Sequence, residues 1–298
     1  MCGIVGLFLK DPALEPQLGS LTETMLATLS DRGPDSAGFA VYGEGRSGET
    51  KLTLRGPSAA AMADIAEHIR RAFSEVQVEL FDTHAVVSIA DQSVAPFEEW
   101  LTRHAPAVDI VGRGKRMALF KEVGLPEKVA ERFGLGAMKG THAIGHTRMA
   151  TESAVTTAHS HPFAPAADLA LVHNGSFSNY ATVRRRLARS GIHCATDNDS
   201  EVAARLVASR MALGEGLDDA LRRVMKEMDG FFTLLVSTAT QFAVVRDSFA
   251  CKPAVIAQTE DYVAMASEYQ ALTSLPGIAD AEVFEPVPEE IYIWNRRS

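Results

Sequence analysis

Apolar positions along the first part of the chain predict a buried strand followed by an amphipathic helix. Gly3 to Leu9 is apolar almost throughout, which is typical of a strand that is buried on both faces. Ser20-Leu21-Thr22-Glu23 has the pattern of a capping box, and apolar residues then recur at helical spacing, so we expect a helix to about Ser30. The segment Arg32 to Ser36 contains Gly33 and Pro34, which prevent the helix from continuing.

The next segments predict short strands and helices without a clear linker between them. Ala37 to Tyr42 and Lys51 to Leu54 are typical of a β-hairpin across a glycine-rich turn, and helical spacing returns from Ala59 to Phe73. Further elements are expected as strands at 84–90 and 108–111 and helices at 95–104 and 126–133. Because no Pro/Ser/Gly-rich linker bounds this region, we interpret about 56–140 as an elaboration of a single domain that spans 2–298.

Three strand-like segments in the middle of the chain end in polar residues, where sites usually lie. These segments are 142–148, 169–174 and the one that leads to Asp199. Two helices should follow, a long amphipathic one that starts at Asp199 and a second at 217–228, and the remainder is rich in strands. The late strands are expected at 231–236, 241–245, 254–257, 262–266 and 291–294. This order favours an α+β fold in which sheets stack and helices cover the outside.

Composition and charge argue against some classes of function. The chain has 298 residues, of which 46% are hydrophobic, and its formal net charge is −9. An acidic protein is a poor match for nucleic acid or an anionic membrane, since both require a basic face. Because no apolar run approaches ~18 residues and the N-terminus lacks the pattern of a signal peptide, we expect a cytoplasmic protein. Its cysteines, Cys2, Cys194 and Cys251, are too scattered for a disulfide framework or a zinc site, and we expect them to be reduced.

Cys2 is the first candidate for chemistry. If the initiator methionine is removed, Cys2 carries both a thiol and a free α-amine, so a nucleophile and a proton acceptor occupy one residue. An ordinary α-amine titrates near pH ~8, close enough to neutrality to accept the thiol proton directly or through a water. The alternative is that Cys2 simply begins a buried strand, because free cysteine often behaves as a small hydrophobic residue.

Several short motifs follow one another over most of the chain: Cys2 to Gly6, Arg32 to Gly38, Gly145 to Thr151, His161-Pro162, Val172 to Gly175, Asp199 to Glu201, Arg246-Asp247 with Lys252-Pro253, and Ala266 to Glu268. In residues and in order they resemble the class II glutamine amidotransferases, which are N-terminal-nucleophile hydrolases. The resemblance implies a four-layer αββα sandwich of two mostly antiparallel sheets. It also implies hydrolysis of L-glutamine to glutamate and ammonia.

The resemblance assigns a role to each matching residue. Cys2 would form a glutamyl thioester, while the Asn174 side chain and the Gly175 N–H would stabilise the oxyanion. Arg148 would bind the substrate α-carboxylate with its planar fork, and Asp199 would receive the α-ammonium.

Two further residues match less central positions of the family, where Arg32 would hold the N-terminal segment and Thr151 would line the glutamine pocket. Each candidate also has a structural alternative. Arg148 could form a surface ion pair, Asp199 could be a helix N-cap, and Asn174-Gly175 could be a simple turn. His159, His161 and His173 flank the proposed pocket and are expected to be loop and packing residues.

The resemblance also suggests a partner. The elaboration is most similar to stand-alone amidotransferase subunits of the glutamate synthase type, including N-methylglutamate synthases. We therefore expect ammonia to pass to a separate synthase subunit, because we find no room for a synthase unit before Ser298. FMN and iron–sulfur clusters would belong to such partner subunits, and no cofactor is expected in this chain.

Other readings of the sequence remain open. His142 and His146 lie four residues apart but lack the glutamate of a zinc-protease helix, so we expect no metal site. The same fold could hydrolyse a different amide, or it could serve as a non-catalytic regulatory or assembly subunit.

Overall fold

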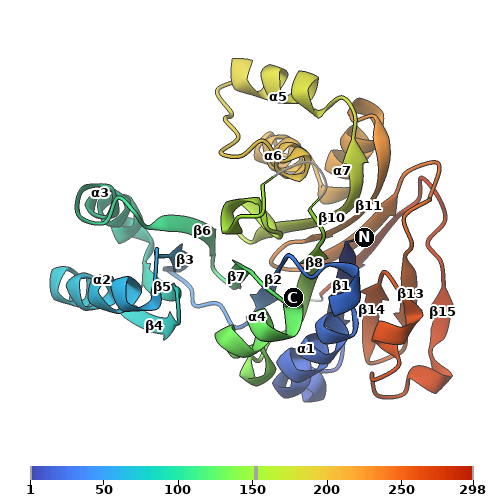
Figure 1. Cartoon of the computed structure of the whole chain (residues 1–298), viewed down its shortest axis with the longest axis horizontal. Helices are drawn as coiled ribbons and strands as arrows, with labels where there is room; N and C mark the ends of the chain where they lie inside the picture. Colours follow the sequence, from blue (N-terminus) through green and yellow to red (C-terminus); the bar gives the residue numbers. More distant parts are fainter. Residues whose placement is uncertain (1, 151–153, 297–298) are drawn as a thin grey trace.

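The computed structural model describes residues 2–150 and 154–296, and it confirms the α+β class with two stacked antiparallel sheets (Figure 1). The seven-stranded sheet has the order β15-β13-β14-β1-β8-β2-β7. Its strands are β1 (Gly3–Leu9), β2 (Ser36–Tyr42), β7 (Met117–Val123), β8 (His142–Arg148), β13 (Val255–Gln258), β14 (Tyr262–Ala266) and β15 (Glu282–Phe284). The five-stranded sheet has the order β16-β12-β11-β10-β9. Its strands are β9 (Phe163–Ala166), β10 (Leu169–Phe177), β11 (Gly230–Ser237), β12 (Gln241–Arg246) and β16 (Ile291–Asn295).

Strand β1 shows how the sequence builds this layering. Ile4 and Phe8 belong to the core between the two sheets, whereas Val5, Leu7 and Leu9 belong to the core under the helices, as the strand period of two requires. Gly6 lies where the sheets approach closely, since a Cβ there would be 2.6 Å from Leu235 and Phe242 of the other sheet. The buried run at Gly3–Leu9 is therefore a central strand of a sandwich.

Helices cover both outer faces and complete the four layers (Figure 1). The helices α1 (Leu18–Thr28) and α4 (Pro126–Phe133) pack on the seven-stranded sheet. The helices α5 (Tyr180–Arg189), α6 (Asp199–Ala212) and α7 (Leu217–Glu227) pack on the five-stranded sheet. No helix in the described ranges is long and apolar enough to cross a membrane.

A third, four-stranded sheet projects from the sandwich with two helices on it (Figure 1, left). Its strands β3 (Glu49–Arg55), β4 (Gln77–Phe81), β5 (His84–Ala90) and β6 (Asp109–Gly114) enclose a separate apolar core with α2 (Ala59–Ala72) and α3 (Val94–His104). We call residues 49–114 the insertion. The expected elaboration at about 56–140 also included β7 and α4. These two elements belong to the sandwich, so the insertion ends earlier than expected.

The predicted hairpin between 37–42 and 51–54 is wrong. β2 pairs with β7 and β8, so both of its edges are occupied, and β3 pairs with β5 and β6 of the insertion. The glycine-rich stretch between them is therefore a connection between two sheets.

Two further expectations are wrong. The predicted capping box at Ser20 fails because α1 continues directly from the 3-10 helix Pro12–Gln17 and begins at Leu18, with Ser20 in its first turn. The segment leading to Asp199 is a loop rather than a strand, and α5 precedes it.

Candidate active site

The backbone around Cys2 is held by side chains from four distant parts of the chain. The Cys2 carbonyl accepts hydrogen bonds from Arg32 Nε and Asn174 Nδ2, both at 3.1 Å. One residue further on, the Gly3 N–H donates to Thr147 Oγ1 at 3.1 Å, and the Ile4 N–H donates to Ser267 Oγ at 2.9 Å. These contacts fix the direction in which the Cys2 side chain leaves the end of β1.

Arg32 contacts two distant segments in this arrangement. Besides its bond to the Cys2 carbonyl, its guanidinium forms an ion pair with Glu268, which follows β14. Arg32 is not among the residues that line the cavity described next. Its contacts therefore join the Cys2 carbonyl to the residue after β14, and its role in holding the N-terminal segment stays a prediction.

A cavity of about 110 Å³ lies beside Cys2. It is far smaller than the ~300–1,000 Å³ pockets that take drug-sized ligands, and its size suits a single amino acid. Its lining is mainly polar and comes from the ends of β1, β8 and β10 and from the loop that leads into α6. The residues are Cys2, Arg148, Met149, His161, His173, Gly175, Ser176, Tyr180, Asp197, Asn198, Asp199 and Ser200.

Arg148 is the principal cationic group of the cavity. Only 4% of it is exposed, and its Nη1 donates to the Ala154 carbonyl at 3.2 Å. Burial lowers the pKa of Arg148, while the nearby Cys2, Asp35 and Asp199 act in the opposite direction. An arginine remains charged in this setting, so the cavity presents a fixed positive group to an anion.

Asp199 is the acidic counterpart at the start of α6. Its Oδ2 accepts from the Phe177 N–H at 2.9 Å, and its Oδ1 accepts from Ser200 Oγ at 3.2 Å. The N-cap of this helix is Asn198, whose side chain accepts from the Ser200 N–H at 2.8 Å. The N-cap explanation for Asp199 is therefore wrong, and its carboxylate faces the cavity.

Asn174 and Gly175 lie within β10 and do not form a turn, because they pair with Thr233 and Phe232 of β11. Asn174 is buried behind Cys2 and does not itself line the cavity, although one of its two amide hydrogens remains after the bond to Cys2. Gly175 does line it, with φ of +152° and no room for a Cβ, which would be 2.0 Å from the Phe231 carbonyl. Only glycine therefore fits at this position against β11.

Two histidines that we expected to be loop or packing residues line the cavity. His161 stacks on His146 with ring centroids 4.0 Å apart, and its Nδ1 accepts from the His173 N–H at 3.3 Å. His173 Nδ1 lies 2.8 Å from Ser200 Oγ, which itself contacts Asp199. Burial lowers the pKa of His161 well below its usual value and lowers that of His146 to about 3, so these rings are neutral near pH 7.

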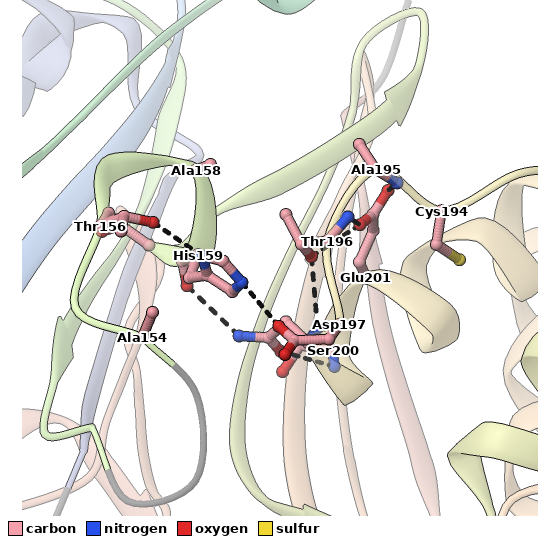
Figure 2. Close-up of polar contacts among 12 residues, drawn as sticks. Ala154, Thr156, Ala158, His159, Cys194, Ala195, Thr196, Asp197, Ser200 and Glu201 are labelled. Atoms are coloured by element: carbon pink, nitrogen blue, oxygen red, sulfur yellow. Dashed lines mark hydrogen bonds and ion pairs between the residues drawn. The ribbon is translucent and has the colours of Figure 1, made fainter.

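Two loops beside the cavity are tied to each other (Figure 2). His159 Nε2 lies 2.6 Å from Asp197 Oδ1, and the His159 carbonyl accepts from Asn198 Nδ2 at 3.2 Å. Asp197, Asn198 and Ser200 were absent from our sequence-based candidates, because a position next to Asp199 does not reveal which side chains turn inward. Thr151, a predicted pocket residue, lies outside the described residues.

Among the described residues no group of three His, Cys, Asp or Glu side chains is placed to hold a metal ion. Cys2, Cys194 and Cys251 are all free thiols, as expected.

Comparisons with known proteins point to one family. Residues 146–274 match the glutamine amidotransferase domain family. The whole chain is 49% identical to the glutamine amidotransferase-like protein GlxB of Rhizobium meliloti (strain 1021), covering 100% of this chain and 99% of that protein. It is also 32% identical to a putative glutamine amidotransferase of Methanothermobacter thermautotrophicus (strain ATCC 29096), over 98% of this chain and 99% of the relative.

Among solved structures, the fold is similar to the glutamine phosphoribosylpyrophosphate amidotransferase from B. subtilis. The TM-score is 0.63 at 21% identity, and the match covers 99% of this chain and 47% of that one. The chain thus spans about half the length of that enzyme, and the similarity concerns the fold.

Proposed function

Because the chain belongs to the glutamine amidotransferase family, we propose that Cys2 attacks the side-chain amide of L-glutamine inside the cavity that it shares with Arg148 and Asp199. The observation that carries this proposal is the pairing of a buried cation and a carboxylate beside one thiol. Arg148 would bind the α-carboxylate and Asp199 the α-ammonium, which leaves the carboxamide directed at sulfur. This arrangement favours an α-amino acid over other amides.

The proposed reaction has two balanced steps. The Cys2 sulfur bonds to the carboxamide carbon, the C–N bond breaks, and ammonia leaves with the thiol proton, which the α-amine of a processed N-terminus carries across. Water then adds to the thioester, the C–S bond breaks, and glutamate and the thiol are released. The Gly175 N–H and the second amide hydrogen of Asn174 would stabilise the oxyanion in both steps.

We further propose that ammonia passes to a separate synthase subunit of the glutamate synthase or N-methylglutamate synthase type, which would hold any FMN and iron–sulfur clusters. The Rhizobium relative supports a separate acceptor, because the match covers 99% of that protein and leaves little room in it for a synthase domain.

Labelling with 6-diazo-5-oxo-L-norleucine, an electrophilic glutamine analogue, tests the nucleophile. We expect peptide mass spectrometry to find Met1 removed and a single adduct on Cys2. Cys194 and Cys251 are free thiols in the same protein and serve as internal controls that stay unmodified. A retained Met1 together with no adduct would instead support a non-catalytic subunit.

Arg148→Gln tests the recognition of the α-carboxylate. Loss of a charge-assisted bidentate contact is expected to raise the glutamine KM by about 100-fold. The variant should also lose its preference for glutamine over 4-aminobutanamide, which lacks the α-carboxylate. Arg186→Gln, which removes a half-exposed arginine on α5, is the matched control and should leave both quantities unchanged. An unaltered KM in the Arg148→Gln variant would show that Arg148 does not bind the α-carboxylate of glutamine.

A further inference from the structure

A second and larger cavity, of about 380 Å³, lies where the insertion meets the sandwich. One wall is formed by the insertion, through Arg55 of β3 and Asp109 to Val111 of β6. The opposite walls are Lys121 of β7, Phe163 of β9, and Glu201 and Arg205 of α6. None of these residues takes part in the proposed glutamine chemistry.

The charges around this cavity do not balance. Three cations, Arg55, Lys121 and Arg205, face two carboxylates, Asp109 and Glu201. The Glu201 carboxylate already accepts four hydrogen bonds, from the Ala195 and Thr196 N–H groups, Thr196 Oγ1 and Arg205 Nε, all between 2.7 and 2.8 Å (Figure 2 draws those from Ala195 and Thr196). It therefore has little capacity left to neutralise a further cation.

The other carboxylate is also a weak partner. The Asp109 side chain is 65% exposed, and its Oδ2 is 3.5 Å from Arg55 Nη1. Arg55 Nε is buried and has no hydrogen-bond partner within the described part of the chain. A buried guanidinium N–H without a partner carries a desolvation cost, which an anion in the cavity would relieve.

Lys121 adds a third positive group in a fixed position. Its residue is 6% exposed, and its Nζ donates to the Ser160 carbonyl at 2.8 Å. The ammonium also lies 4.9 Å from the centroid of the Phe163 ring. Phe163, Ile110 and Val111 make the remaining wall apolar, so the cavity combines cations with a hydrophobic surface.

We propose that this second cavity binds a small organic anion, with its carboxylate or phosphate group between Arg55 and Arg205 and its apolar part against Phe163 and Ile110.

The second cavity shares its dividing wall with the glutamine cavity. Thr157 and Ala158 line the second cavity and His161 the first, while Ala195 and Thr196 line the second and Asp197 and Asn198 the first. The contacts of His159 with Asp197 and Asn198 join these two segments (Figure 2). An anion that draws Arg205 or Lys121 towards it therefore acts on the loop that carries Asp199. This coupling of the second cavity to glutamine hydrolysis rests on the proposed function.

Isothermal titration calorimetry with phenyl phosphate and with succinate tests the binding site. We expect at least one probe to bind with a Kd below ~1 mM, and Arg55→Gln to weaken its binding about tenfold or more. Arg103→Gln is the matched control, since Arg103 is an exposed arginine of the same insertion that pairs with Glu99 at 3.6 Å. It should leave Kd unchanged, and circular dichroism checks that both variants are folded.

The same titration on the Arg148→Gln variant distinguishes the two cavities, because any anion that binds beside Cys2 would lose its cation there. If the probe binds the Arg148→Gln variant as tightly as the wild type, its site is the second cavity. This conclusion does not depend on whether the protein hydrolyses glutamine. Absence of binding by both probes, or equal binding by wild type and Arg55→Gln, would overturn the site. If a probe binds there and the glutamine KM does not change, the regulatory coupling is wrong and the site stands.

Discussion

Cys2→Ala is expected to lower the rate of ammonia release from glutamine by about 10⁴-fold or more, because removing the nucleophile of a covalent mechanism abolishes its first step. The fold should survive, because the hydrogen bond of the thiol to the Met149 carbonyl is weak, at 3.6 Å, while the segment is held through backbone groups of Cys2, Gly3 and Ile4. A coupled glutamate and ammonia assay under single-turnover and steady-state conditions measures the loss.

The two other cysteines provide the comparison. Cys194→Ala and Cys251→Ala remove free thiols that lie outside the cavity, and both variants should keep the wild-type rate. A Cys2→Ala protein that retains more than about a tenth of the activity would exclude the thioester mechanism. Thermal melts of all three variants separate loss of chemistry from loss of folding.

Acid is expected to unfold the protein well before its buried histidines can titrate in the native state. Burial lowers the pKa of His84, His142 and His146 to about 3 in each case. The unfolded chain takes up these protons near pH ~6.5, so it binds more protons than the folded chain between about pH 6.5 and 3. The stabilisation is complete above pH ~6.5 and is lost as pH falls towards 3.

The size of this effect is large. Each proton contributes about 1.4 kcal/mol per pH unit, so three histidines remove roughly 4 kcal/mol per unit below pH 6.5. A domain of ordinary stability, about 5–15 kcal/mol, would then unfold above about pH 3. Urea unfolding at a series of pH values measures how steeply the free energy of unfolding changes with pH.

His84→Phe tests the origin of the slope. His84 packs against Phe120 and Phe133, and its Nε2 is buried without a partner among the described residues. Phenylalanine removes both the titrating group and the unpaired atom. The number of protons taken up on unfolding should therefore decrease by about one, and the free energy of unfolding should change less steeply with pH. The exposed His68→Gln on α2 is the control and should not change it, and an unaltered slope in His84→Phe would refute the assignment.

Sequence reasoning located most of the site because its main residues belong to short local motifs. Arg148, Gly175 and Asp199 each stand at or near the end of a predicted element, and the structure brings all three to the cavity beside Cys2. The neighbouring His161 and His173, expected as loop and packing residues that flank the pocket, line the cavity and pack on His146 and Phe177. Which of their ring atoms face the cavity depends on which face of β10 and of the preceding loop meets α6, and no local pattern determines that.

The wrong predictions about the fold have the same physical cause. Whether Ser36–Tyr42 and Glu49–Arg55 pair with each other depends on competition from β7 and β8, which lie far away in sequence. Helix α5 escaped notice because it buries only Val183 and Leu187 and is otherwise polar and arginine-rich. The loop after it resembles a strand, but Glu201 satisfies its N–H groups in place of a sheet partner.

The separate core of the insertion has a consequence for how the chain folds. Tyr42 and Met117 are paired neighbours, although the entire insertion lies between them in sequence, and Lys51 pairs with Gly114 at the base of the insertion. A disordered connection of that length would impose a substantial closure entropy on the pairing of β2 with β7. An insertion that folds first brings its two ends together and reduces the closure to two short connections. The long-range contact at the edge of the seven-stranded sheet would then form with a closure cost close to that of a local contact.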